Sequence, residues 1–167
     1  MLKFLKLNTA LLFILITAPW VVNLFFENQD YRLYVSIFAN TILLLWFFSL
    51  DAELTKRIPS KIRPSNTMFI LNSVLIYLGN CIAVIFLEPQ TSFTVTGIAA
   101  LPFLYIFYAL FSIFSHLSKI LTYAEEEKEI PTSKRIGEMF SFFFFIVGIW
   151  WLQPRIQAVL SKPPINI

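Results

Sequence analysis

The distance between successive charged residues is the feature that most constrains how this chain can fold. Four uncharged runs, of 20, 18, 24 and 30 residues, lie between charged positions in the first 119 residues. A helix needs about 20 predominantly apolar residues to cross about 30 Å of hydrocarbon. We therefore expect four transmembrane helices, at about residues 8–26, 33–50, 67–87 and 94–129, and the last should continue about two turns into water.

Composition supports the same interpretation. The 167 residues are 57% hydrophobic and 14% charged, with a mean hydropathy of +0.72, whereas a soluble domain carries about 25% charged residues. Backbone polar groups cannot stay unpaired in lipid, so the spans should be helices. The prediction is an all-α, polytopic integral-membrane helical bundle, with one domain over residues 1–167 and the lipid bilayer around it. The net charge of +3 then reflects basic loops, and no nucleic-acid partner is expected.

A fifth apolar segment, at residues 137–152, is short for a transmembrane span. Only 16 uncharged residues lie between Glu138 and Arg155, with Gly148 in the middle. Such a length is typical of a re-entrant or interfacial segment. The sequence leaves two alternatives, a hairpin-like insertion around Gly148 or a thin crossing, and the basic residues of the tail favour the first.

The basic residues predict which way the bundle faces. If the N-terminus is cytoplasmic, ten Lys and Arg residues before the tail fall on the cytoplasmic side and one, Arg32, falls on the other. Cytoplasmic loops carry an excess of Lys and Arg, so we expect this orientation. The first apolar run should be a retained helix and not a cleaved signal peptide, because the site after Ala18 is a poor cleavage site, with Ile16 where a small residue is needed and Pro19 directly after it.

Neutral polar residues recur on three of the predicted spans. Ionisable groups, which mark ion pathways and proton relays, are missing from the middle of the four long runs, and this disfavours an ion-coupled transporter. The polar positions can be contacts between helices, or they can line a pore or ligand pocket. They are Asn40, Asn72, Asn80, Tyr105, Tyr108, Ser112 and, beside them, His116.

The single histidine, His116, has no second metal-binding residue at ligand spacing, so we predict neither a metal nor a cofactor. We expect it to bond to a neighbouring helix instead. We expect the acidic cluster at residues 125–129 to be a solvated helix end. Five basic residues at the predicted cytoplasmic interface suit anionic lipid headgroups: Lys56, Arg57, Arg63, Lys134 and Arg135.

Several motifs carry a resemblance to a known family. They are Glu88-Pro-Gln-Thr-Ser92, Ser115-His-Leu-Ser-Lys119, Gly137-Glu-Met-Phe140 and Gly148-Ile-Trp-Trp-Leu-Gln-Pro-Arg-Ile156. The chain resembles an uncharacterised family of small polytopic bacterial membrane proteins with a C-terminal Phe-rich, Gly-Ile-Trp and Gln-Pro-Arg signature. The resemblance implies a membrane fold in the bacterial inner membrane, and it implies no activity.

These observations favour a non-enzymatic scaffold or accessory subunit that presents cytoplasmic loops to a protein partner. A homo-oligomer is compatible with this role. The alternative is an oligomeric channel or pore-forming effector lined by the neutral polar residues. A third class, an enzyme acting on lipids, would need a nucleophile paired with a base. The only candidate group for such chemistry is His116 with the nearby carboxylates.

Overall fold

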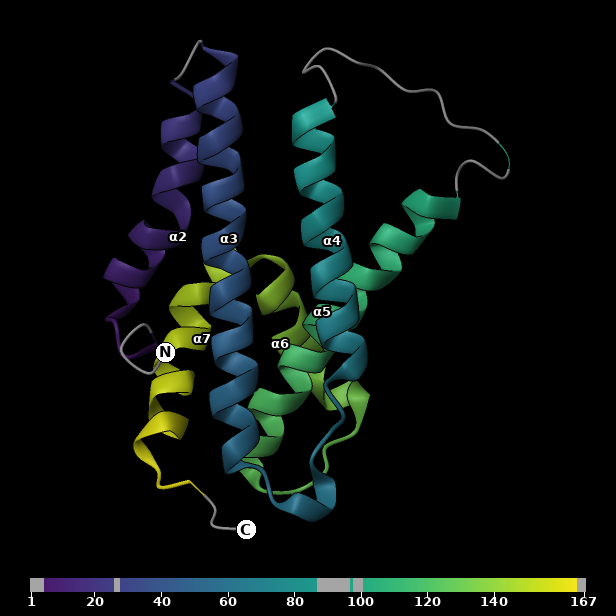
Figure 1. Cartoon of the computed structure of the whole chain (residues 1–167). Coiled ribbons are helices and arrows are strands. Elements are labelled where there is room, and N and C mark those ends of the chain that lie inside the picture. The colour runs from purple at the N-terminus through teal and green to yellow at the C-terminus, as the bar shows by residue number, and fades with distance from the viewer. Residues whose placement is uncertain (1–4, 26–27, 87–96, 98–100, 165–167) are drawn as a thin grey trace.

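The protein is an all-helical membrane bundle (Figure 1). The computed structural model describes residues 5–25, 28–86, 97 and 101–164. Every regular element among them is helical, which confirms the predicted fold class. The elements are α2 (Thr9–Asn23), α3 (Gln29–Leu54), η1 (Thr55–Arg57), η2 (Ser60–Ile62), α4 (Thr67–Phe86), α5 (Leu101–Glu126), α6 (Thr132–Phe143) and α7 (Phe145–Ser161), where η marks a short 3₁₀ helix.

Three helices, α3, α4 and α5, are long and apolar enough to cross a membrane. Helix α4 matches the expected span, and α3 extends beyond it at both ends, to Gln29 and Leu54. Helix α5 begins at Leu101, and the part of its predicted span before that residue lies outside the described residues, apart from position 97. It ends at Glu126 and not at residue 129, because Glu127 has a φ of 54°, a left-handed conformation that stops the helix.

The first predicted span is shorter than expected. Helix α2 has 15 residues, which corresponds to about 22 Å against about 30 Å of hydrocarbon. It begins where the side chain of Asn8 caps it by accepting a hydrogen bond from the backbone of Leu11, at 2.7 Å. The residues before the cap turn aside to meet α7, so they do not lengthen the helix.

The fifth apolar segment forms a helical hairpin, α6 and α7, bent by 119°. The bend lies at Phe144, and not around Gly148 as the sequence suggested. Both ends of the hairpin lie at the lower end of the bundle in Figure 1, near the end of α5. At that end Lys162, just after α7, donates a hydrogen bond to the backbone carbonyl of Glu125. This arrangement supports the re-entrant alternative.

Gly148 has a different role, at the contact between α6 and α7. A Cβ atom at this position would overlap the backbone carbonyl of Ser141 on α6. The residue is fully helical and buried, so its missing side chain allows the two helices of the hairpin to touch through their backbones.

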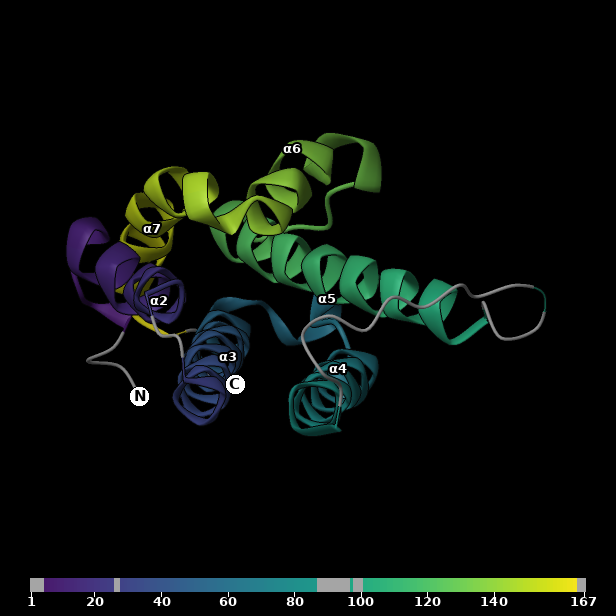
Figure 2. The same ribbon diagram turned by 90° about the horizontal axis from the view of Figure 1, so that it is seen from above.

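One buried apolar cluster joins α2 through α7. Its largest members, Trp46, Phe69 and Phe142, come from α3, α4 and α6. The first two turns of α5 carry exposed apolar side chains, and burial begins at Ala109. Seen from above, this part of α5 runs outward past α4 (Figure 2). The core is therefore densest in the lower half of the bundle, where α5, α6 and α7 meet α3.

Candidate functional site

Two side-chain bonds join α3 to α4 outside the buried core, where Asn80 is exposed and its neighbours are partly buried. The amide nitrogen of Asn40 donates to Oδ1 of Asn80 at 2.6 Å. One turn away, the hydroxyls of Thr41 and Tyr77 are 2.8 Å apart. The Thr41 hydroxyl already donates to the carbonyl of Ile37, so Tyr77 is the donor of this pair. The sequence placed Asn40 and Asn80 on candidate polar faces, and the structure brings them together.

The other predicted polar positions of α4 and α5 are only partly brought together. The Tyr105 hydroxyl donates to Oδ1 of Asn72 at 2.9 Å and links α5 to α4. Tyr108 is exposed, with its ring 6.0 Å from that of Tyr105. Ser112 is partly buried, and neither it nor Tyr108 has a polar side-chain partner in the described part of the chain. The regular spacing of these residues along α5 therefore does not place them all against one neighbour.

His116 bonds to α3, where its partner is Asp51. Its Nε2 lies 2.7 Å from Oδ1 of Asp51, and both side chains are about nine-tenths buried. The second carboxylate oxygen accepts from the Asn66 amide at 3.1 Å. The ring of Phe69 stacks on the imidazole, with centroids 4.7 Å apart. The sequence predicted a bond to a neighbouring helix but not its partner, since Asp51 lies 65 positions away.

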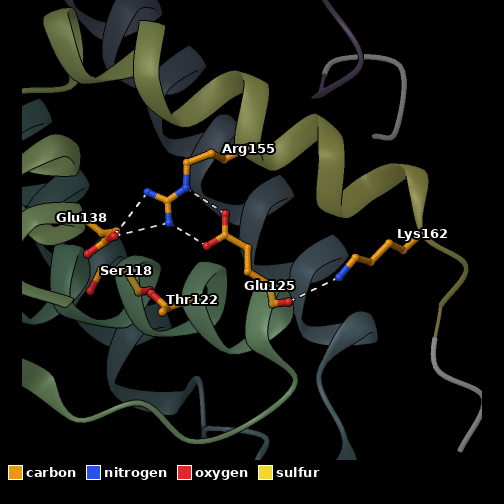
Figure 3. Close-up of polar contacts among 6 residues, drawn as sticks. All are labelled: Ser118, Thr122, Glu125, Glu138, Arg155 and Lys162. Atoms are coloured by element: carbon orange, nitrogen blue, oxygen red, sulfur yellow. Dashed lines mark hydrogen bonds and ion pairs between the residues drawn. The ribbon is translucent and has the colours of Figure 1, made fainter. Parts of the chain in front are cut away.

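An arginine clamp fastens α7 to α5 and α6 (Figure 3). The guanidinium of Arg155 donates to both carboxylate oxygens of Glu125, at 2.8 and 2.6 Å. It also reaches Glu138 on α6, at 3.3 Å. A planar guanidinium bound through two parallel bonds fixes both distance and orientation. We call these three residues the Arg155 clamp. Its partners could not be foreseen from the sequence, because Glu125 begins the acidic cluster that was expected to be solvated, whereas the structure pairs its partly buried side chain with Arg155.

The basic residues expected at lipid headgroups divide into two groups. Lys56 and Lys134 are exposed, and Lys56 pairs with Glu53 at 2.9 Å. Arg57 and Arg135 are instead buried, and this differs from the expected lipid contact. Arg57 donates to the carbonyls of Glu53 and Leu160, at 2.7 and 3.2 Å.

The other two arginines of this predicted lipid-binding set also bind backbone carbonyls. Arg135 donates to Ile130 at 3.1 Å, and the partly buried Arg63 donates to Ile58 at 3.3 Å. The last carbonyls of a helix have no partner within it, and a guanidinium with five donors can satisfy several of them. The arginines therefore hold helix ends and connectors in place.

A half-open cavity of about 670 Å³ lies between the helices, and the Asn40–Asn80 pair forms part of its lining. Its walls come from α2, α3, α4 and α5, and its floor comes from the turn between α6 and α7. Most of the lining is apolar, with a narrow strip of neutral polar side chains that includes Asn40, Asn80 and Ser73. Three of its aromatic side chains, Phe13, Phe47 and Phe114, face it from three different helices.

The fold and these contacts define the class: a polytopic helical membrane protein with a sharply bent helical pair, α6 and α7, and neutral polar contacts between its spans. No protein-family model, curated protein or solved structure matches the chain. The resemblance of its C-terminal motifs to a bacterial membrane family stays a prediction. Among the described residues, no group of three His, Cys, Asp or Glu side chains is placed to hold a metal ion.

Proposed function

We propose that the protein is a non-enzymatic scaffold or accessory subunit of the bacterial inner membrane, with its N-terminus in the cytoplasm. The charge distribution supports this orientation. If the α6–α7 hairpin returns to the side on which it enters, the two basic residues of the tail join the ten already on that side. Arg32 is then the single Lys or Arg on the opposite side, as expected if the lower end of the bundle is cytoplasmic.

The connector between α3 and α4, residues 55–66, carries the proposal of a partner-binding role. Buried Arg57 binds this connector to the end of α7, and Asn66 binds it to Asp51. It is therefore held in a defined shape, with Lys56 and Lys61 exposed on it. Beside it, the end of α5 exposes Glu126 and the residues that follow. A fixed surface carrying both signs of charge is suited to a protein partner.

The surroundings of His116 support a structural role over a catalytic one. Nucleophilic catalysis would pair the imidazole with a hydroxyl or thiol. Here one ring nitrogen is bonded to Asp51, and Phe69 covers a face of the ring. The side chain is only 10% exposed, which leaves little room for a substrate.

The channel alternative has less support. The neutral polar groups would have to face a continuous water path, whereas Asn40 and Asn80 bond each other across α3 and α4. The cavity beside them is mostly apolar, and apolar constrictions favour dewetting over conduction. A homo-oligomer remains part of the proposal, since the exposed Phe residues of α5 and α6 offer apolar surface to another copy.

In-cell photocrosslinking at native expression level tests the proposal. A benzoyl-phenylalanine residue at Lys61 should give one discrete adduct, because this position lies on the proposed partner surface. The matched control is the same residue at Arg32, which is also exposed but lies at the opposite end of the bundle, and it should give none. Equal labelling from both positions, or from neither, contradicts the scaffold role. Single-channel currents from reconstituted protein that vanish in Asn80→Leu would favour the channel instead.

A further inference from the structure

Two cations, one from α5 and one from α6, share a single tyrosine ring and have no carboxylate partner. The ammonium of Lys119 lies 5.4 Å from the centroid of the Tyr123 ring, and the Cζ atom of Arg135 lies 5.7 Å from it. In the described part of the chain neither cation has an Asp or Glu oxygen within 4.0 Å. Arg57, the other arginine buried there, pairs with Glu53 at 3.6 Å. Two uncompensated like charges favour an anion beside them.

The hydroxyl of Tyr123 is a further donor beside these cations. The residue is only 5% exposed, and its hydroxyl makes no hydrogen bond to the described residues. It is not one of the unbonded side-chain atoms that are sealed from the surface, and neither is the ammonium of Lys119. Both groups therefore reach the surface and can donate to one acceptor that comes from outside. Because polar groups in largely buried side chains are nearly always satisfied, the Tyr123 hydroxyl indicates such an acceptor.

The N-terminus of α6 adds a third positive feature. The helix follows Pro131, and no side chain caps it. Arg135 folds back over this end, where it donates to the carbonyl of Ile130 at 3.1 Å and to the Thr132 hydroxyl at 3.0 Å. The first amides of a helix have no acceptor within it and carry the positive end of its dipole. An anion at this end meets backbone donors as well as the two side chains of α5.

An apolar stripe leads from this end of α6 toward the middle of the bundle (Figure 1). Ile136, Phe140 and Phe143 follow Thr132 at intervals of four, four and three residues, so they share one face of the helix. Each of the three side chains is about half exposed. From Ile136 to Phe143 the stripe is about 10 Å long, compared with about 15 Å for the hydrocarbon of one leaflet. A ligand with an anionic head and long apolar chains can therefore contact both the donors and the stripe.

We propose that this site binds one anionic phospholipid. Its phosphate accepts from the Tyr123 hydroxyl, from the Lys119 ammonium and from the first backbone amides of α6, and its acyl chains lie along the apolar stripe. Because Arg135 is buried, it adds positive charge from behind and does not itself contact the lipid. A free phosphate has the same head chemistry, but only a lipid uses the stripe. The site goes beyond the scaffold role, which concerns the connector at residues 55–66.

Native mass spectrometry of the full chain in detergent, titrated with phosphatidylglycerol or with phosphatidylcholine of the same acyl chains, tests this. The first phosphatidylglycerol should bind about twentyfold more tightly, because each of two cations contributes about fivefold. Lys119→Gln should remove about fivefold of this preference. Tyr123→Phe keeps the ring and removes only the hydroxyl, and it should weaken binding about fivefold, the effect of one lost hydrogen bond.

Two matched controls should leave the binding of phosphatidylglycerol unchanged. Lys128→Gln removes an exposed cation that already pairs with Glu126, at 3.3 Å. Tyr34→Phe removes the hydroxyl of an exposed tyrosine near the start of α3. Two further measurements separate a lipid from a free phosphate. Glycerol phosphate, the head without the chains, should not displace the lipid even in large excess, and Phe140→Ser, which interrupts the stripe, should lower lipid occupancy.

Three results would overturn the proposal. Equal affinity for the two lipids means that the cations are not used. A preference that Lys119→Gln and Tyr123→Phe both leave intact means that the lipid binds elsewhere. Displacement by glycerol phosphate, together with unchanged occupancy in Phe140→Ser, means that the site holds a soluble phosphate and not a lipid. Circular dichroism and unfolding temperature of each variant exclude misfolding, and Lys119→Gln decides alone if Tyr123→Phe does not fold.

Discussion

The imidazole of His116 and the carboxylate of Asp51 meet at 2.7 Å in the lower half of the bundle and join α5 to α3. Both side chains are about nine-tenths buried. The pair is extended by Asn66, from the connector, and by the stacked ring of Phe69, from α4. The three long helices α3, α4 and α5 and the connector are thus joined at one point.

We expect His116→Ala to destabilise the protein strongly. The substitution leaves the Asp51 carboxylate buried without its main partner, and breaking a buried pair in this way costs about 3–5 kcal/mol. Thermal unfolding in detergent measures the loss. The exposed pair of Lys128 with Glu126, at 3.3 Å, provides the control: Lys128→Ala should cost about 0–1 kcal/mol. If His116→Ala and Asp51→Asn have additive effects in the double variant, the two residues are not coupled and the interpretation fails.

The Arg155 clamp predicts that Lys cannot replace Arg. Arg155→Lys keeps the charge but loses the two parallel bonds to Glu125, because an ammonium group is a point charge without the planar fork. Hydrogen bonds to charged groups contribute about 1.5–3 kcal/mol each, so we expect a loss of that order in unfolding free energy. Glu138→Gln should cost less, since its contacts are longer, at 3.3 and 3.4 Å. Equal stability of Arg155→Lys and the wild type would contradict the clamp.

The positions of the spans could be read from the sequence, because the spacing of charges reflects the thickness of the membrane. Helix α4 falls where the uncharged run between Arg63 and Glu88 predicted it. The break at Phe144 could not be read, because it lies in a run of Phe residues without Gly or Pro to mark it. It depends on the contact of Gly148 with the backbone of Ser141, which forms only when the two helices fold together.

The side-chain partners that join different helices could not be predicted from the sequence either. The sequence shows that Arg57 lies near a membrane interface, but not that the carbonyls at the end of α7 will approach it. Their separation of 103 positions leaves no local pattern to detect. Local spacing identified Asn40 and Asn80 as candidate polar contacts, whereas only the packing of α3 on α4 made them partners, and Asn80 stays exposed.

The N-terminal segment should depend on Gln153. Its amide nitrogen donates to the carbonyls of Leu5 and Leu7, at 2.8 and 3.0 Å, and the side chain is fully buried. Gln153→Leu removes both bonds, so residues 5–8 should lose protection in hydrogen–deuterium exchange while α4 keeps its own. Gln157→Leu, which removes one bond to Leu7, at 2.6 Å, should have a smaller effect. Unchanged protection of residues 5–8 in Gln153→Leu would show that the Gln157 bond and the apolar contacts of Leu5 hold the segment without Gln153.

The close packing of α6 on α7 predicts opposite effects of alanine at two glycines. A Cβ atom on Gly148 would overlap backbone atoms of Ser141, which cannot move aside as a flexible side chain can. Gly148→Ala should therefore force α6 and α7 apart, and overpacking of this kind costs about 1–3 kcal/mol.

Gly137 lies on α6, in the same hairpin, and no atom lies within 4 Å of the position a Cβ would take there. Gly137→Ala is thus the matched control, and it should stabilise the protein by about 0.5–1 kcal/mol, since alanine loses less conformational freedom in a helix. Unfolding temperatures in detergent give the sign of both effects. Spin labels at residues 134 and 161, in a Cys81→Ser background, report the geometry of the hairpin. Their distance distribution should widen in Gly148→Ala and stay narrow in Gly137→Ala, and the same distribution in both variants would contradict a backbone contact at Gly148.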